Sequence, residues 1–352
     1  MAARMTAALE DRLRDPENGV AELRALLAAL LAGPGELAIV VYQALRPSRV
    51  YRLRLRRGEV ERSYVVKRLS PDRSQREQRA VRRWLPRLGL GAHASPLLGV
   101  AAVRDGAYVW HVYEDLGERT LASAPVDPDE VRAAVRLVAE IHVRFAESSL
   151  LGECREFGMD LGPRLYAAGV RDALRALEAL RRGPPERIGG PDGPVARLLE
   201  RLAGLRDAEP EKTRRLAAAG GPETLLHGDL WTSNVLVRAD AESLHVRLID
   251  WEQAGVGSVT YDLSAFLLRF PAAERAWILD CYADAARRLD WAVPDRETLN
   301  ALFETAETAR IVSSLLWAAL ELLEKPAAWA VERLAEAERW LDALGPVLPA
   351  VR

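Results

Sequence analysis

Residues Leu226 to Val237 read Leu-His-Gly-Asp-Leu-Trp-Thr-Ser-Asn-Val-Leu-Val and carry the strongest structural signal of the chain. Within this stretch, Asp229 is followed five residues later by Asn234, and a short apolar run typical of a strand comes directly after. A second short strand is expected at residues 244–249, and it ends at Asp250. A hairpin of these two strands would point Asn234 and Asp250 at one spot.

These residue types suit phosphoryl transfer from Mg-ATP. In that reaction one Asp accepts or orients the proton of the acceptor hydroxyl, while an Asn and a second Asp hold Mg²⁺. Magnesium prefers hard oxygen ligands and needs few of them from the protein. The alternative is structural, because Asp and Asn are common in turns and at strand ends. The His-Gly-Asp prefix and the two strands favour the functional interpretation for Asp229, Asn234 and Asp250.

The segment from His227 to Asn234, together with Ile249-Asp250, resembles the aminoglycoside phosphotransferase and choline kinase family of small-molecule kinases. The resemblance in layout covers most of the chain. It implies an α+β, two-lobed, protein-kinase-like fold with a small antiparallel-sheet N-lobe and a larger, mainly helical C-lobe. It also implies Asp229 as the catalytic residue and Asn234 and Asp250 as magnesium ligands.

Asp262 lies in a Tyr-Asp-Leu segment that looks like a family segment in which an Asp braces the catalytic loop. Its alternative role is the N-cap of a helix over residues 262–268. Both interpretations fit the sequence.

The length of 352 residues allows about two domains. Hydrophobicity patterns place most strands in the first third and mainly helices after residue 127. We expect strands at 37–42, 49–55, 60–69, 100–103, 107–113 and 235–237, and helices at 19–32, 74–88, 128–146, 161–182, 195–219 and from 261 onward. The predicted organisation is an N-terminal lobe over 1–113, a hinge over 114–117 and a helical C-terminal lobe over 118–352.

A kinase-like N-lobe needs a Lys on its third strand, contacting the nucleotide phosphates, and a Glu on the next helix to hold it. Lys67 ends the third expected strand and is one of three lysines in the chain, and Glu77 follows ten residues later. The structural alternative is a solvated strand end and a helix-start acid. Arg76 and Arg79 are competing partners for Glu77.

Three further assignments complete the nucleotide side. The resemblance places a hinge at Glu114 to Gly117, and we expect backbone contacts to adenine at Glu114 and Leu116. Three apolar residues either contact the adenine ring or are ordinary core residues: Val66, Leu69 and Leu236. The loop over the phosphates lacks glycine, unlike that of protein kinases, and Ser48 is its predicted phosphate contact, with Arg46 and Arg49 as alternatives. The cofactors expected are ATP, with GTP not excluded, and Mg²⁺.

The acceptor side is expected after Asp262 and in residues 150–222. The long helical pattern over 297–324 places acids and a Trp on one face, which suits a cationic or sugar-like ligand. The alternative is an exposed helix with an internal Glu307–Arg310 pair. The substrate-site residues predicted here are Trp231, Glu307, Trp317 and Glu321.

The remaining acids and histidines receive smaller roles. Glu252 is either an outer contact of the metal or a solvated turn acid, and His142 is structural. His93, His111 and His245 have no metal-ligand spacing and are assigned no role.

Composition excludes several classes of protein. The net charge of −2 and the pI of about 6.3 argue against a nucleic-acid partner. The most apolar early stretch, 25–32, is too short to span a membrane. Two cysteines cannot form a disulfide framework. We expect a soluble cytoplasmic protein, as a monomer or a homodimer.

The function predicted from the sequence is an ATP- and Mg-dependent O-phosphotransferase, a small-molecule kinase. Its acceptor is a hydroxyl of an antibiotic such as an aminoglycoside or nucleoside antibiotic, an amino alcohol or a sugar, and antibiotic resistance is one role. The alternative is a catalytically silent nucleotide-binding regulatory module of kinase-like fold. The presence of Lys67, Asp229, Asn234 and Asp250 favours the enzyme.

Overall fold

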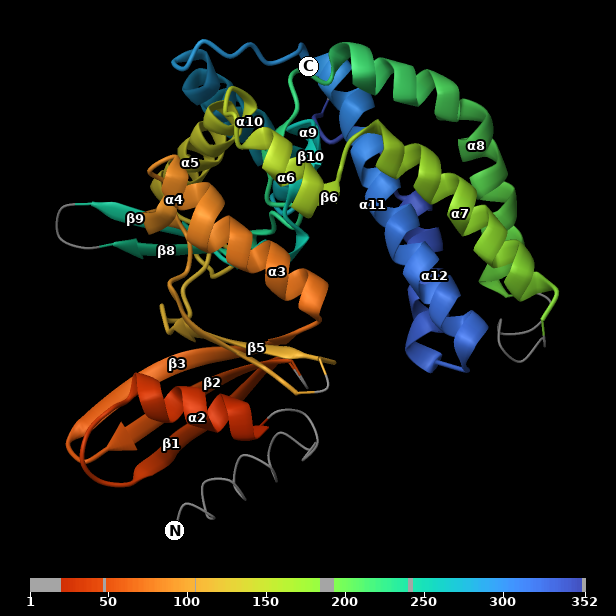
Figure 1. The fold of residues 1–352 in the computed structure, drawn as a ribbon. Coiled ribbons are helices and arrows are strands. Elements are labelled where there is room, and N and C mark those ends of the chain that lie inside the picture. The colour runs from red at the N-terminus through yellow and green to blue at the C-terminus, as the bar shows by residue number, and fades with distance from the viewer. Residues whose placement is uncertain (1–19, 47–48, 105, 184–192, 240–242, 350–352) are drawn as a thin grey trace. The chain divides into compact units, whose positions relative to one another are not determined.

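The computed structural model describes residues 20–46, 49–104, 106–183, 193–239 and 243–349. The chain forms two compact units. Unit 1 combines Met1–Val126 with Ser233–Ala254, and unit 2 combines Asp127–Thr232 with Gly255–Arg352. The predicted α+β class, with an antiparallel sheet in the N-terminal part and a mainly helical C-terminal part, is confirmed (Figure 1).

Unit 1 is built on a five-stranded antiparallel sheet. Its order is β1-β2-β3-β5-β4, and the bounds are β1 (Leu37–Arg46), β2 (Val50–Arg57), β3 (Val60–Leu69), β4 (Leu97–Ala102) and β5 (Val109–Glu114). Every strand expected here from the sequence is present. Helix α2 (Val20–Leu30) packs its Leu23 and Leu27 into the core of this unit, together with Leu53 and Trp110.

A helical segment follows β3, as expected. It begins at Pro71 as α3 (Pro71–Arg79), continues through a π-helical turn over Ala80–Trp84, and ends with α4 (Leu85–Arg87). Proline suits the first turn of a helix because its missing N–H would have no intrahelical partner there. This start places Glu77 in the second turn, with its side chain buried.

The short hairpin of β8 (Val235–Ala239) and β9 (Leu244–Leu248) also belongs to unit 1. Val235 pairs with Leu248, and an isolated bridge joins Thr120 to Leu236. The predicted strand pair on either side of residues 240–242 is therefore confirmed. A 3₁₀ turn over Trp251–Gln253 follows Asp250.

Unit 2 is mainly helical. Its helices are α5 (Pro128–Ala146), α6 (Leu151–Phe157), α7 (Pro163–Arg181), α8 (Pro194–Ala219), α9 (Thr260–Leu267), α10 (Ala272–Arg287), α11 (Arg296–Glu324) and α12 (Ala328–Asp342). A three-stranded sheet, with order β6-β10-β7, consists of β6 (Met159–Asp160), β7 (Thr224–Leu226) and β10 (Gly255–Gly257). The sequence did not predict α6 or this sheet.

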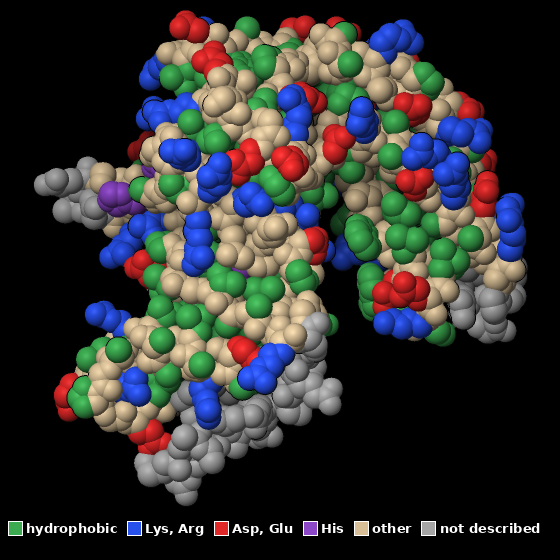
Figure 2. Space-filling model, viewed as in Figure 1, with side chains coloured by type: hydrophobic (Ala, Val, Ile, Leu, Met, Phe, Trp, Pro, Cys, Tyr) green, Lys and Arg blue, Asp and Glu red, His purple; other side chains and the backbone are tan. Residues whose placement is uncertain are grey.

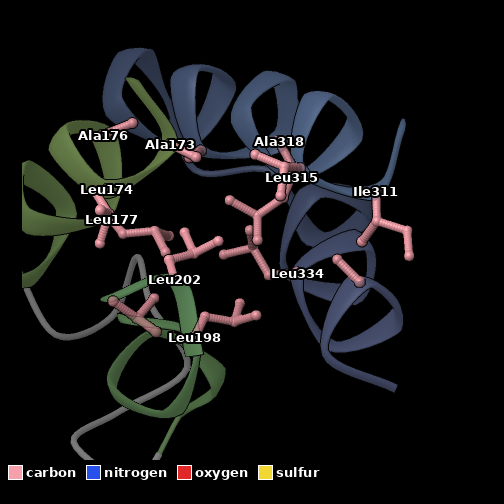
Figure 3. Close-up of a cluster of buried hydrophobic side chains, with 14 of the residues drawn as sticks. Ala173, Leu174, Ala176, Leu177, Leu198, Leu202, Ile311, Leu315, Ala318 and Leu334 are labelled. Carbon is pink, nitrogen blue, oxygen red and sulfur yellow. The ribbon is translucent and has the colours of Figure 1, made fainter. Parts of the chain in front are cut away.

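Helices α7, α8, α11 and α12 share one hydrophobic core (Figure 3). This core contains both alanines, such as Ala173 and Ala318, and leucines, such as Leu177, Leu198 and Leu315. Burying each leucine contributes roughly 1.5–3 kcal/mol. This core fixes α11, which carries side chains of the candidate acceptor site.

None of the helices in the described ranges is both long enough and apolar enough to cross a membrane. On the face drawn in Figure 2, basic and acidic side chains are interspersed. This mixture agrees with the small net charge of the sequence.

Candidate active site

Lys67 occupies the centre of a charged cluster in unit 1. Strand residues alternate between faces, so Val66 enters the core while Lys67 points to the opposite face of the sheet. Its side chain is buried, and its Nζ lies 3.2 Å from Glu77 Oε2 and 2.9 Å from Glu252 Oε2 and also pairs with Asp250. Burial alone would lower the pKa of Lys67, but the three carboxylates raise it above its ordinary value. Lys67 is therefore a fixed cation.

Glu77 comes from α3 and is almost fully buried. Burial raises the pKa of its carboxyl group, against the attraction of Lys67. Of the two predicted competitors, Arg76 bonds to Asp72 at 3.0 Å and donates to the carbonyl of Glu252 at 2.9 Å. The Lys67–Glu77 pair expected from the sequence is thus present.

A buried histidine that the sequence left without a role supports this pair. His111 faces Lys67 across the strand pairing of β3 and β5. Its Nε2 lies 2.7 Å from Ser74 Oγ and its Nδ1 lies 2.8 Å from the hydroxyl of Tyr113, which in turn is hydrogen-bonded to Glu77. Burial, and then the charges of Lys67 and Arg82, lower the pKa of His111 to about 3. A neutral His111 therefore links Ser74 and Tyr113 beneath Glu77.

Asn234 and Asp250 lie at the same end of the β8–β9 hairpin. The amide of Ile249 donates to the carbonyl of Asn234 at 3.0 Å, so Asp250 follows directly after the last contact of the hairpin. Asp250 adopts a left-handed backbone conformation, with φ of 70°, which Asp tolerates better than most residues. Besides Lys67, Arg46 lies 3.7 Å from its carboxylate.

These oxygen donors suit a magnesium ion. The hairpin supplies a carboxylate from Asp250 and a side-chain amide from Asn234, both hard ligands of the type Mg²⁺ takes. Carboxylate oxygens of Glu77, Asp250 and Glu252 also lie within 4.8 Å of one another. The donor set therefore fits the ion that the sequence predicted.

The prediction of Glu252 as a solvated turn acid is wrong. Its carboxylate is buried and accepts from Arg49 at 3.1 and 3.2 Å and from Arg73 at 2.9 Å, in addition to Lys67. Arg49 is therefore tied to an acid rather than being fully solvated. The 3₁₀ turn after Asp250 brings Glu252 back toward Lys67.

A cavity of about 400 Å³ within unit 1 collects most of the predicted nucleotide residues. This volume is in the range of small-molecule sites. Lys67, Glu77, Glu114, Leu116, Asn234 and Asp250 all line it. Ser48 lies outside the described residues.

The apolar lining of this cavity corrects one expectation. Leu236 lines it as expected, but Val66 and Leu69 lie in the core instead. Val65 takes the place expected of Val66, because residues 65 and 67 share one face of the strand. The alternative interpretation of Val66 and Leu69 as plain core residues is therefore the right one.

In unit 2 the loop after β7 carries Asp229. Asp262 is fully buried and accepts from the backbone amides of His227 at 2.7 Å and Gly228 at 3.0 Å. Burial by itself would raise the pKa of Asp262, but the hydrogen bond and charge of His142 and the His227 amide lower it. Since α9 begins at Thr260, the N-cap interpretation of Asp262 is wrong, and this residue braces the loop.

Helix α11 brings part of the predicted acceptor face to the same region. Glu307 accepts from Ser264 Oγ at 2.7 Å and lies 3.5 Å from Arg310. Trp317 is 66% exposed and lies about 15 Å further along the helix axis, and Glu321 lies about 21 Å further. The amide of Trp231 donates to the carbonyl of Asp229, and the charges of Glu307 and Asp229 both act on Arg310. Glu307 and Trp231 therefore belong to the surroundings of Asp229, whereas Trp317 and Glu321 lie elsewhere on α11.

The fold and the Lys–Glu pair beside an Asn/Asp hairpin define a kinase-type phosphotransferase. Residues 45–302 match the model of the phosphotransferase enzyme family, so the chain belongs to that family. It is therefore a small-molecule phosphotransferase. No curated protein matches the chain in sequence.

Solved structures with this fold include small-molecule kinases of several kinds. Choline kinase LicA from Streptococcus pneumoniae superposes with a TM-score of 0.57 at 16% identity, covering 92% of this chain and 98% of that one. The ethanolamine kinase from Plasmodium vivax superposes with a TM-score of 0.59 at 13% identity, covering 96% of this chain and 93% of that one. A spectinomycin phosphotransferase in complex with ADP and spectinomycin gives 0.54 at 12% identity, with 89% and 90% covered. At these identities the likeness shows the protein-kinase-like fold.

Proposed function

We propose that the protein transfers the γ-phosphate of ATP to a hydroxyl of a small molecule, with Mg²⁺ as its metal cofactor. One observation carries the proposal: a buried Lys67–Glu77 pair, the Asn234/Asp250 hairpin end and the predicted hinge all line one cavity of unit 1. Family membership and the ADP in the spectinomycin phosphotransferase structure support a nucleotide donor.

On the nucleotide side, Lys67 would contact the α- and β-phosphates while Glu77 holds it in place. The amide of Glu114 already donates to the carbonyl of Pro96 at 3.1 Å. Glu114 would therefore offer adenine its carbonyl and Leu116 its amide. Ser48 keeps its predicted role as a phosphate contact. Asn234 and Asp250 would hold Mg²⁺, which neutralises phosphate charge when bound.

On the acceptor side, Asp229 would orient the hydroxyl and accept its proton. The hydroxyl oxygen forms a bond to the γ-phosphorus, the bond from that phosphorus to the bridging oxygen breaks, and ADP leaves. Asp262 holds the loop amides of His227 and Gly228, so that Asp229 starts from a fixed backbone. Acceptors of the predicted range are antibiotics, amino alcohols and sugars.

The test is ADP release from Mg-ATP against a panel of hydroxylated compounds of this range. Asp229→Ala should lower turnover by at least about 100-fold, since proton transfer contributes about 10²–10⁴-fold. The affinity of the Asp229→Ala variant for Mg-ADP should stay close to wild type. The Asp250→Ala variant should lose both turnover and affinity for Mg-ADP. Near-normal turnover by Asp229→Ala would remove its assigned role. Nucleotide binding without turnover of any compound would favour the silent module instead.

A further inference from the structure

The two aromatic rings beside the Asp229 loop already carry guanidinium groups. Arg269 lies over the ring of Trp231 at 4.3 Å from its centroid, and Arg310 lies over the ring of Tyr261 at 4.0 Å. The amide of Trp231 donates to the carbonyl of Asp229 at 2.8 Å, so this ring borders the loop directly. A cationic ligand that stacked on either ring would meet a guanidinium group already in contact with that ring.

The carboxylates around the loop are also engaged. The carboxylate of Asp262 accepts hydrogen bonds from two backbone amides of the loop and is hydrogen-bonded to His142. Glu307 accepts from Ser264 and lies beside Arg310, whose Nη2 donates to the carbonyl of Tyr261 at 2.6 Å. An acceptor with an ammonium group therefore meets arginines here, and Asp262 and Glu307 are already engaged by other groups.

Arg269 lacks a carboxylate partner among the described residues. Arg269 is exposed, and its guanidinium group stacks on the ring of Trp231. Its neighbour Arg275 donates to the neutral carbonyls of Phe270 and Val347 at 3.0 and 3.1 Å. Burial, and then the charge of Arg269, lower the pKa of Arg275. Arg269 and Arg275 therefore repel each other, and within the described ranges neither guanidinium group has a carboxylate partner.

We propose that the acceptor carries an anionic group, a carboxylate or a phosphate ester, which pairs with Arg269 while its hydroxyl lies at Asp229. A guanidinium held on an aromatic ring keeps its planar donors oriented for such an anion. The inference rests on the proposed function and narrows its acceptor range, from antibiotics, amino alcohols and sugars in general to hydroxylated compounds that carry a carboxylate or a phosphate ester. Arg269 is then a specificity-determining residue, and Arg310 adds a fixed positive charge to the same region.

The experiment measures binding, because binding does not require the compound to be turned over. Dissociation constants are determined on the full chain, with Mg-ADP present, for two sets of compounds. The first set is gluconate, glucose 6-phosphate, glucose and glucosamine, and the second is 4-hydroxybutanoate and 4-aminobutan-1-ol. In each set an anionic compound should bind about ten- to 100-fold more tightly than the amine, which corresponds to one charge-assisted hydrogen bond. Gluconate against glucose 6-phosphate distinguishes a carboxylate from a phosphate ester.

Arg269→Gln should remove this preference, whereas Arg288→Gln, at an exposed position after α10, should retain it. Equal or tighter binding of the amines overturns the inference, as does a preference for acids that survives Arg269→Gln. Failure of every acid to bind at about 10 mM overturns it too. The effect of Asp229→Ala on turnover is a separate readout, so an error here is distinguishable from an error in the proposed function.

Discussion

Replacing Lys67 with Met tests whether the charged cluster of unit 1 is organised by one ammonium group. Met is similar in length but carries no charge. The substitution leaves Glu77, Asp250 and Glu252, whose oxygens lie within 4.8 Å of one another, without their shared partner. Because Glu77 and Glu252 are buried, their carboxylates lose a cation that sparse solvent does not match.

The structure sets the size of the effect. Removing one partner of a buried ion pair costs about 3–5 kcal/mol. Arg49 and Arg73 still hold Glu252, so the loss falls mainly on Glu77. We therefore expect a destabilisation of unit 1 by about 3 kcal/mol at pH 7, at the lower end of that range. The melting temperature would fall by roughly 6 to 12 °C for a unit of this size.

The pH dependence follows from the raised pKa of Glu77. A raised carboxyl pKa means that the folded state favours the protonated form. The cost of Lys67→Met should therefore shrink as the pH falls toward about 4.3, the ordinary value for Glu, and grow as it rises through the folded pKa. The pKa of Lys67 is raised as well, so its own contribution is lost only above about 10.4 and does not disturb comparisons between pH 5 and 8.

The assay is urea unfolding at pH 5 and pH 8, combined with hydrogen exchange of β3 and α3 to report on unit 1 alone. The matched control is Lys212→Met. Lys212 pairs with Glu304 at 2.6 Å in unit 2, where the acid is half exposed, and such a pair contributes about 0–1 kcal/mol. A cost of Lys67→Met no larger than that of the control, or a cost that does not diminish at pH 5, would show that Lys67 does not organise this cluster.

Two further predictions concern the supports of the site. Asp262→Ala should lower turnover by at least about 100-fold with little change in ATP affinity, because Asp262 fixes the loop amides of unit 2. Steady-state kinetics combined with nucleotide titration measures both quantities. A loss confined to ATP affinity would contradict this prediction. His111 should stay neutral between pH 5 and 8, so its NMR ring signals should not titrate there, since its pKa is lowered to about 3. Because the folded pKa is lowered, stability should decline as the pH falls below about 6.5, and substitution by Gln should reduce that decline.

The sequence predicts what depends on short-range pattern. A stretch rich in Val and Tyr and a rare Lys identified β3 and Lys67, and two short apolar runs after Asp229 predicted the hairpin. Helix α5 was predicted with the bounds it has in the structure. These features have strong local periodicity, so no tertiary information was required.

What could not be predicted depends on tertiary pairing. His111 supports Glu77 because β5 pairs with β3 in one register, and a single sequence does not give the register. Glu252 reaches Lys67 through a turn whose geometry no pattern encodes. Strands β6, β7 and β10 have two or three residues each, too few for alternation to appear. The choice between Val65 and Val66 was within reach, since the face that carries Lys67 also carries Val65.

The segment from His227 to Asn234 is anchored twice, once in each unit. His227 and Gly228 are tied by their amides to Asp262 in unit 2, whereas Asn234 is tied through its carbonyl to the amide of Ile249 in unit 1. Only the residues from 229 to 233 connect these anchors. Changes at Asp262 should therefore act on the acceptor side and changes in the hairpin on the nucleotide side. This separation is the physical reason to expect that substitutions of Asp229 and Asp250 differ in their effect on nucleotide binding, although the proposed function assigns both residues to one reaction.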